Sequence, residues 1–311
     1  MTEPGRIAVV DLGTNSTRLL IADLTGDGVL AEVRRRSEVT RLGDGVDATG
    51  RLSDEAVERV LNCLAGYREL ADELGAGRRI AVATSAVRDS ANGDEFQERV
   101  RSALGFDIRT ITGDEEARLT FLGATAGRDP GPPTLVVDIG GGSTEYVVGE
   151  PGSAPTFHVS TRLGSVRQTE RHLESDPPAH GEMAALATAA REIIADGVPQ
   201  RVRTGTAAGI AVAGTATQLA AVDQQLEPYD RSKVHGYRLL LGECERILAR
   251  LAAQPLAERR RVPGLDPDRA PTIVAGAAIL VESMRLFGLD YVEVSEADIL
   301  HGAAIDAMVR S

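Results

Sequence analysis

Two short segments of the chain place an aspartate before a turn of glycines and small polar residues. The first is VVDLGTNSTR at residues 9–18, and the second is VVDIGGGSTE at residues 136–145. Apolar residues precede and follow each turn, which predicts a β-hairpin with a polar, glycine-bearing turn. Because the pattern occurs twice, the sequence predicts two related halves that face a shared cleft.

The turns themselves have the composition of an anion site. Backbone amides of such turns bind phosphate, and glycine allows a close approach because it has no Cβ. The second turn has three successive glycines, more than a turn requires. A P-loop and a dinucleotide fingerprint are excluded, because no Gly-Lys-Ser/Thr follows and each turn leads into a second strand. We therefore expect phosphate-binding turns at residues 13–16 and 140–143.

A group of acids follows in TGDEEAR, residues 112–118. Thr112 and Glu115 have the spacing of a capping box, which accounts for Glu115. Glu116 points to another side of the same helix. Hydrolysis of a phosphate bond needs a base that orients and deprotonates water. From the sequence, Glu116 fits either that base or a solvent-exposed acid favoured by the helix dipole.

The elements that must position these residues alternate between strand and helix. A helix begins at the N-cap Ser53 and continues to residue 74. We expect buried strands at 80–83, 108–111, 135–138, 145–148, 209–213 and 291–294, and helices at 96–104, 112–126, 182–194, 239–251, 270–287 and the C-terminus. This alternation predicts the α/β class. Residues 127–133, rich in Gly and Pro, are a candidate linker.

Length and charge narrow the class of protein. A chain of 311 residues predicts two domains. The net charge of −12 argues against nucleic-acid binding, which needs a basic face. No apolar run is long enough for a membrane span and the N-terminus lacks a signal-peptide pattern, so we expect a cytoplasmic protein with no membrane partner. Cys63 and Cys244 are expected to be reduced thiols, and the arginines at 34–36 and 259–261 to lie on solvated faces.

Four segments together resemble one known family. They are DLGTNS at 11–16, ATSAVR at 83–88, GDEEARL at 113–119 and DIGGGSTE at 138–145. In this order they closely resemble the exopolyphosphatase/guanosine pentaphosphate phosphatase (Ppx/GppA) family, in its short two-domain form. The resemblance implies an actin/sugar-kinase/Hsp70-like (ribonuclease H-like) fold, with a βββαβα core in each duplicated domain and a cleft between them. The expected domains are 1–126 with a C-terminal helix at about 299–311, and 127–298.

The resemblance also implies roles for individual residues. Glu116 corresponds to the catalytic carboxylate that activates water, and Arg88 to an arginine that points into the cleft. Asp138 and Glu145 correspond to ligands of Mg²⁺ (or Mn²⁺). The expected phosphate-binding residues are Gly13, Thr14, Asn15, Ser16, Gly140, Gly141, Gly142 and Ser143.

Arg18 departs from the symmetry of the two hairpins, and the segment 298–302 departs from the family pattern. The first hairpin has Arg18 where the second has Glu145, so only the second is expected to hold metal. The segment DILHG at 298–302 stands where the family often has Leu-Arg-Glu-Gly. The missing Arg-Glu pair puts an active-site or docking role of this segment in doubt.

The expected function is a Mg²⁺-dependent exopolyphosphatase that releases orthophosphate from linear polyphosphate. One alternative is guanosine pentaphosphate (pppGpp), a substrate that would connect the chain to the stringent response. Another is a small-molecule kinase of the same superfamily with an ADP or ATP site at residues 214–215. A third is a non-catalytic nucleotide or phosphate sensor. The resemblance further implies a homodimer.

Overall fold

The computed structural model describes residues 5–24 and 30–309. These form two compact units: unit 1 contains the described residues up to Gly123 and those from Ile299 onward, and unit 2 is Ala124–Asp298. The first division follows Gly123, three residues before the boundary expected from the sequence. The chain passes from one unit to the other twice, within the helix α5 (Gly113–Thr125) and just before the last helix, α14 (Ile299–Val309).

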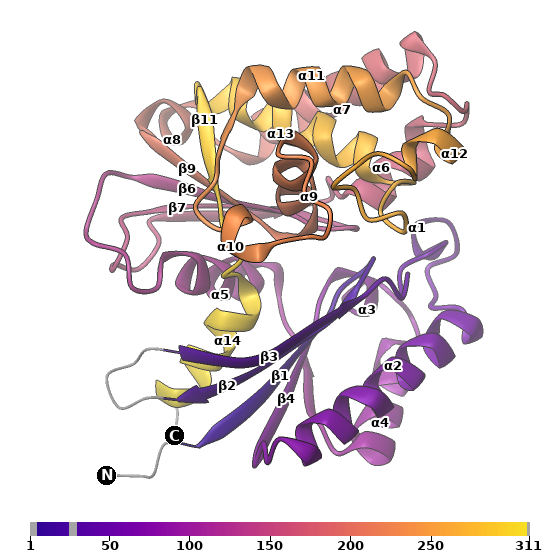
Figure 1. The fold of residues 1–311 in the computed structure, drawn as a ribbon, viewed down its shortest axis with the longest axis vertical. Helices are drawn as coiled ribbons and strands as arrows, with labels where there is room; N and C mark the ends of the chain where they lie inside the picture. The colour runs from indigo at the N-terminus through magenta and orange to yellow at the C-terminus, as the bar shows by residue number, and fades with distance from the viewer. Residues whose placement is uncertain (1–4, 25–29, 310–311) are drawn as a thin grey trace. The chain divides into compact units, whose positions relative to one another are not determined.

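Unit 1 contains a five-stranded mixed sheet (Figure 1). Its strands are β1 (Arg6–Leu12), β2 (Thr17–Leu24), β3 (Leu30–Glu38), β4 (Arg78–Ala83) and β5 (Asp107–Thr110). The order is β3-β2-β1-β4-β5, with β1, β2 and β3 antiparallel and β4 and β5 parallel to β1. The turn at residues 13–16 therefore lies at the end of the central strand, where β1 passes into β2.

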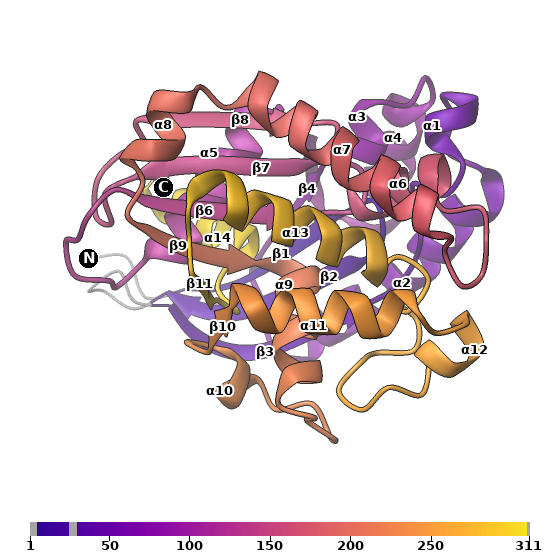
Figure 2. The same ribbon diagram turned by 90° about the horizontal axis from the view of Figure 1, so that it is seen from above.

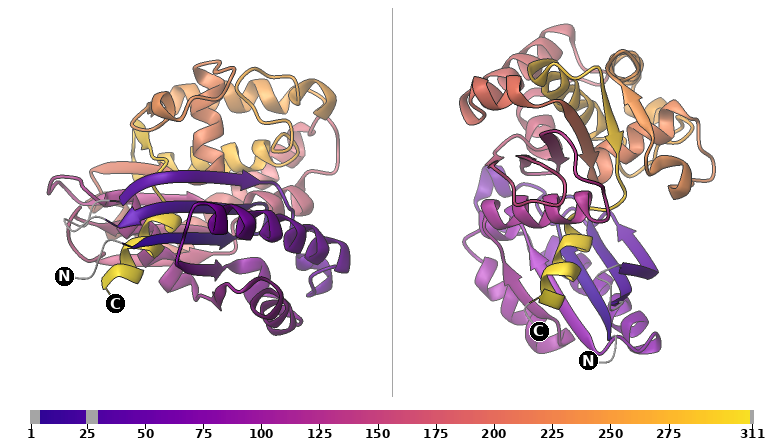
Figure 3. Two further views of the ribbon diagram at one scale, coloured as in Figure 1. Left: turned by 60° about the horizontal axis from the view of Figure 1, so that its bottom comes forward. Right: turned by 90° about the vertical axis from the view of Figure 1, so that its left-hand side faces the viewer.

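Helices cover both faces of this sheet because β1 is apolar on both sides. Ala8 and Val10 pack in one core with α2 (Asp54–Glu73) and α4 (Gly93–Leu104). Ile7 and Val9, which point to the other face, pack in a second core with α5 and α14. Figure 3 shows α14 lying along the strands on this second face. Two short helices, α1 (Val46–Thr49) and α3 (Ser85–Arg88), lie in the connections.

Unit 2 repeats this sheet and adds an edge strand. Its strands are β6 (Thr134–Ile139), β7 (Thr144–Gly149), β8 (Phe157–Thr161), β9 (Ala208–Val212), β10 (Arg238–Leu240) and β11 (Tyr291–Val294). The order is β10-β11-β9-β6-β7-β8. Without β10, both sheets have the same order of three antiparallel strands followed by two parallel ones. The α/β class and the duplicated βββαβα core are therefore confirmed.

The helices of unit 2 enclose an apolar core of their own. They are α6 (Ser165–His172), α7 (His180–Gly197), α8 (Gln200–Gly205), α9 (Ala213–Asp223), α10 (Arg231–Val234), α11 (Leu241–Ala252), α12 (Leu256–Arg259) and α13 (Ile273–Phe287). Figure 2 shows α7, α13 and α11 side by side, with α13 in the middle. Accordingly, α13 is buried along almost its whole length. Its Ser283 bonds the Tyr146 hydroxyl of β7 at 2.8 Å, so it is fixed to the hairpin that carries the second turn.

Some expectations from the sequence were wrong. Residues 239 and 240 belong to strand β10 rather than to a helix, because Leu239 is buried opposite Val292 while Leu240 is exposed.

Arg259 is buried rather than solvated. It donates hydrogen bonds to three backbone carbonyls, those of Leu251, Gln254 and Ala270, and burial lowers its pKa. In the described parts of the chain, no helix combines the length and the apolar character that crossing a membrane requires.

Within the segment 298–302, His301 and Gly302 have packing roles in unit 1. His301 Nδ1 accepts a hydrogen bond of 3.2 Å from Arg35 Nη2 on β3. Gly302 lies directly against α5, where an added Cβ would be 1.8 Å from the Leu119 carbonyl oxygen. Only glycine allows α14 to approach α5 this closely.

Gly302→Ala is therefore expected to lower the free energy of unfolding by about 1–3 kcal/mol, since the helices must separate. Gly66→Ala in α2 is the matched control, because nothing lies within 4 Å of its added Cβ. That variant should gain about 0.5–1 kcal/mol from helix propensity. Urea unfolding of both variants measures the difference. Equal stability of the two would contradict the close packing of α14 on α5.

Candidate active site

The turn between β1 and β2 is held by hydrogen bonds that its carbonyl groups accept. Gly13 N donates to Ser16 O at 3.1 Å, which closes the turn. From outside the hairpin, the amides of residues 43 and 41 donate to Thr14 O at 2.9 Å and Asn15 O at 3.0 Å. In a trans peptide the C=O and the N–H point in opposite directions. The amides of Asn15 and Ser16 therefore face the other side, and neither donates to a protein acceptor within the described residues.

The turn between β6 and β7 is held in the same manner by a different element. Gly140 N donates to Ser143 O at 3.0 Å. The carbonyls of residues 140–142 accept hydrogen bonds from the first turn of α6. Backbone amides in the first turn of a helix have no partner within their own helix. The contacts are Ser165 N to Gly140 O at 2.8 Å, Val166 N to Gly141 O at 2.9 Å and Arg167 Nε to Gly142 O at 2.8 Å. The amides of residues 141–143 consequently face away from α6, and across the described chain they donate to no protein group.

Both turns are thus arrays of outward-facing amides. Such arrays bind anions, phosphate above all. Each of the eight predicted phosphate-binding residues belongs to one of them, four in unit 1 and four in unit 2. Whether they bind phosphate stays a prediction.

Asp138 and Glu145 are cross-strand partners in the β6–β7 hairpin. Directly paired side chains lie on the same face of a sheet with their Cβ atoms about 4.5–5.5 Å apart. Both residues are buried, and Glu145 Oε1 also accepts a hydrogen bond of 2.7 Å from Ser160. Two carboxylates at this separation repel each other when both are ionised. A divalent cation relieves that repulsion.

The equivalent pair in unit 1 is different. Asp11 and Arg18 are also cross-strand partners, and Arg18 Nη2 lies 2.6 Å from Asp11 Oδ2. This pair is an ion pair and has no need of a metal. The same register therefore pairs an acid with a base in unit 1 and two acids in unit 2.

The acidic pair of unit 2 fits Mg²⁺ or Mn²⁺. In the described ranges, no group of three or more His, Cys, Asp or Glu side chains is arranged to hold a metal ion. Mg²⁺ does not require one, because it is usually bound by one or two carboxylates together with water and substrate phosphate oxygens. Asp138 and Glu145 supply that donor set.

Glu116 is buried and paired. Its residue is 7% exposed, so the alternative of a solvent-exposed acid is wrong. Arg88, at the end of α3, donates from Nη1 to Glu116 Oε2 at 3.0 Å and to the Ile111 carbonyl at 3.0 Å. Thr112 caps the helix through the amide of Glu115, whose carboxylate pairs with Arg109. The two adjacent acids of α5 therefore have different partners, and Glu116 is held against Arg88.

A single helical turn connects Glu116 with the first amide-lined turn. At the start of α3, Ser85 Oγ lies 2.8 Å from Thr14 Oγ1. At its other end, Arg88 contacts Glu116. The structure thus joins Arg88, Glu116 and the turn at 13–16 within unit 1. Sequence reasoning gave no role to Ser85 or to the donors at residues 41, 43 and 165–167. Ser85 lies inside a family motif, whereas the others carry no local signal.

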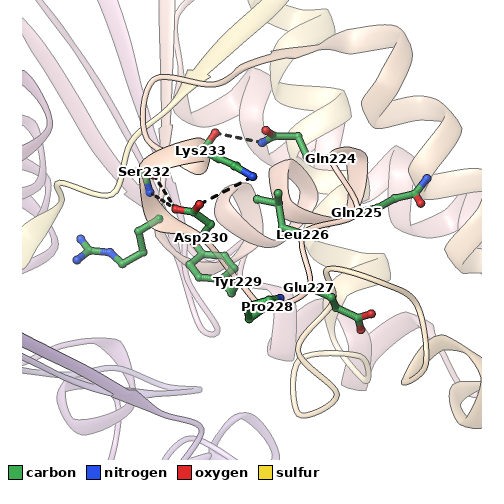
Figure 4. A pocket seen from close by; sticks show the side chains of 10 residues that line it. Gln224, Gln225, Leu226, Glu227, Pro228, Tyr229, Asp230, Ser232 and Lys233 are labelled. Atoms are coloured by element: carbon green, nitrogen blue, oxygen red, sulfur yellow. Dashed lines mark hydrogen bonds and ion pairs between the residues drawn. The ribbon is translucent and has the colours of Figure 1, made fainter.

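Other candidate groups are engaged elsewhere. A cavity of about 530 Å³ in unit 2 is lined by residues 224–233 (Figure 4). None of the predicted site residues lines it, and its Asp230 caps α10 by accepting from Ser232 N. His235 Nδ1 accepts from Glu296 N, which is a structural contact. Burial raises the pKa of both cysteine thiols to about 12, so neither is a nucleophile near neutral pH.

Turns that present backbone amides in this way are typical of proteins that bind phosphate groups. A sequence model of the Ppx/GppA phosphatase family matches residues 20–311, and the chain belongs to this family. It is 38% identical to Exopolyphosphatase 2 of Mycobacterium tuberculosis over 317 residues, which covers 96% of this chain and 98% of that protein.

Solved structures of the same family have the same fold. The Aquifex aeolicus Ppx/GppA family member superimposes with a TM-score of 0.83 at 32% identity, covering 98% of both chains. An exopolyphosphatase from Cytophaga hutchinsonii gives a TM-score of 0.89 at 27% identity, covering 97% of this chain and 98% of that one. The family resemblance found in the sequence is therefore confirmed.

The acidic pair of unit 2 yields a test of metal binding. Glu145→Gln should weaken Mn²⁺ binding by about tenfold or more, because one of two charged ligands is lost. Glu150→Gln, an exposed acid just beyond β7, removes the same charge and should bind Mn²⁺ as the unchanged protein does. Electron paramagnetic resonance of Mn²⁺ titrated into each folded variant measures this. Equal affinities in the two variants would exclude Glu145 as a ligand.

Proposed function

We propose that this protein is an exopolyphosphatase, which hydrolyses the terminal phosphoanhydride of linear inorganic polyphosphate and releases orthophosphate. The observation that supports it most is the buried Glu116 held by Arg88 in the same unit as an amide-lined turn. Relatives that bear the name exopolyphosphatase support the choice of substrate.

In this proposal Glu116 is the general base. Arg88 fixes the carboxylate through Oε2, and the carboxylate accepts the proton of the attacking water. The water oxygen forms a bond to the terminal phosphorus, and the bond from that phosphorus to the bridging oxygen breaks. The bridging oxygen leaves as an anionic end of the shortened chain. The products are orthophosphate and a polyphosphate one unit shorter.

The amide-lined turns stabilise the negative charge of the phosphoryl oxygens. Their amides are already oriented by the contacts to the carbonyls, so little reorganisation is needed when the charge develops. When bound, Mg²⁺ or Mn²⁺ held by Asp138 and Glu145 would neutralise part of the phosphate charge. Metal dependence is part of the proposal.

The pppGpp alternative uses the same chemistry on another leaving group, and the substrate comparison below includes it. An arginine side chain occupies the space beside residues 214–215, where an ADP or ATP site was considered. The guanidinium of Arg269 lies against Gly214, where an added Cβ would be 1.8 Å from Arg269 Nη1. A nucleotide in contact with Gly214 would have to displace that side chain. The homodimer stays a prediction.

The test measures orthophosphate release with Mg²⁺ from long-chain polyphosphate, tripolyphosphate, pppGpp and ATP. Glu116→Gln should lower kcat on polyphosphate by at least about 100-fold, because the general base is lost. Glu115→Gln is the control, since this adjacent acid of α5 pairs with Arg109 instead. It should retain nearly full activity.

Full activity of a correctly folded Glu116→Gln would overturn the role of Glu116. Faster release from pppGpp than from any polyphosphate would assign the other substrate while keeping the mechanism. Release from none of the four substrates would contradict the proposed hydrolase.

A further inference from the structure

Arg167 is a buried cation directly behind the second amide-lined turn. Its residue is only 5% exposed. Its Nε donates to the Gly142 carbonyl at 2.8 Å, and its backbone amide donates to the Gly141 carbonyl at 3.1 Å. Arginine is rarely this deeply buried. Two of its donors therefore serve the backbone of the turn rather than solvent.

The peptide that Arg167 contacts has little else to fix its orientation. Glycine has the widest range of backbone conformations, and residues 140–142 are three glycines in succession. Backbone amides of α6 hold the first two of their carbonyls. The third, Gly142 O, is held by the Arg167 side chain. Because C=O and N–H point in opposite directions in a trans peptide, this contact directs the Ser143 N–H away from α6.

In unit 1 the equivalent peptide is oriented without a charged side chain. The carbonyl at the equivalent position is that of Asn15, and it accepts from the backbone amide of residue 41 at 3.0 Å. In unit 2 the donor is a guanidinium, which keeps its proton at every physiological pH. A hydrogen bond from a charged donor is stronger than one between neutral groups, so the Gly142 peptide is held firmly.

We infer that Arg167 is a positioning residue for phosphate: through its hydrogen bond to the Gly142 carbonyl it holds the Ser143 amide toward the side of the turn that receives a phosphoryl group. The inference rests on the proposed function for its substrate class, a phosphoanhydride. Arg167 acts through the Gly142 peptide and takes no part in bond making or breaking. Its loss should therefore weaken phosphate binding in the second turn while the first turn is unaffected.

The experiment follows the backbone amides of both turns by nuclear magnetic resonance during titration with inorganic phosphate. In Arg167→Gln, half-saturation of the Gly142 and Ser143 shifts should need about tenfold more phosphate, as expected when a hydrogen bond to a charged group is lost. The shifts of Asn15 and Ser16 should be unchanged. Arg167→Lys, which keeps a charged N–H donor, should recover part of the affinity.

Two further measurements separate positioning from a general structural effect. Arg171→Gln removes the same charge from an exposed position of the same helix and should titrate as the unchanged protein does. In steady-state assays Arg167→Gln should raise the KM for polyphosphate more than it lowers kcat, because the turn contacts phosphate in both the bound and the transition state.

The inference is overturned if Gly142 and Ser143 in Arg167→Gln titrate as in the unchanged protein, or if both turns lose phosphate affinity equally. It is also overturned if these two amides of the unchanged protein do not respond to phosphate. A protein whose Ser143 amide responds to phosphate but which releases no orthophosphate from polyphosphate would refute only the proposed function.

Discussion

The direction in which the backbone amides of two short turns point depends on the hydrogen bonds that the carbonyl groups of these turns accept. A protein partner for the carbonyl of a peptide holds the N–H of the same peptide pointing to the opposite side, where a ligand can bind. In unit 1 that partner is the segment at residues 41–43, and in unit 2 it is the first turn of α6. The two solutions use unrelated segments for one geometric purpose.

The duplicated hairpins also show how one register can give two kinds of site. The residue opposite the aspartate is Arg18 in unit 1 and Glu145 in unit 2. A single change of charge converts an ion pair into a pair of acids suited to a hard cation. The acid proposed as the base, Glu116, lies in the unit whose hairpin is already neutralised. In the proposed mechanism, metal binding and water activation therefore belong to different units of the chain.

Local sequence predicted the parts of the site that have local causes. Glycines and small residues after a buried strand indicate an amide-lined turn, and Thr112 at a helix start indicates a cap. The supports behind the turns could not be predicted, because Gly43 and Arg167 act through contacts distant in sequence. The pairing of Glu116 with Arg88 could not be predicted from hydrophobic periodicity, because these two residues are also distant in sequence.

The fold was predicted where the hydrophobic period was regular, and errors occurred where it was ambiguous. Residues 239–241 are three leucines, and a continuous apolar run does not separate a short strand from a helix start. Edge strand β3 was missed because it is largely exposed and carries three successive arginines. The burial of Arg259 depends on three carbonyl acceptors that only the folded chain brings together.

The central claim is that the outward-facing amides of the two turns are where phosphate binds. A crystal structure of Glu116→Gln with Mg²⁺ and tripolyphosphate tests it most directly. The account predicts phosphate oxygens within about 2.7–3.2 Å of the backbone nitrogens of Ser16 and Ser143. Tripolyphosphate bound elsewhere, for example in the cavity lined by residues 224–233, with neither turn in contact with phosphate, would contradict it.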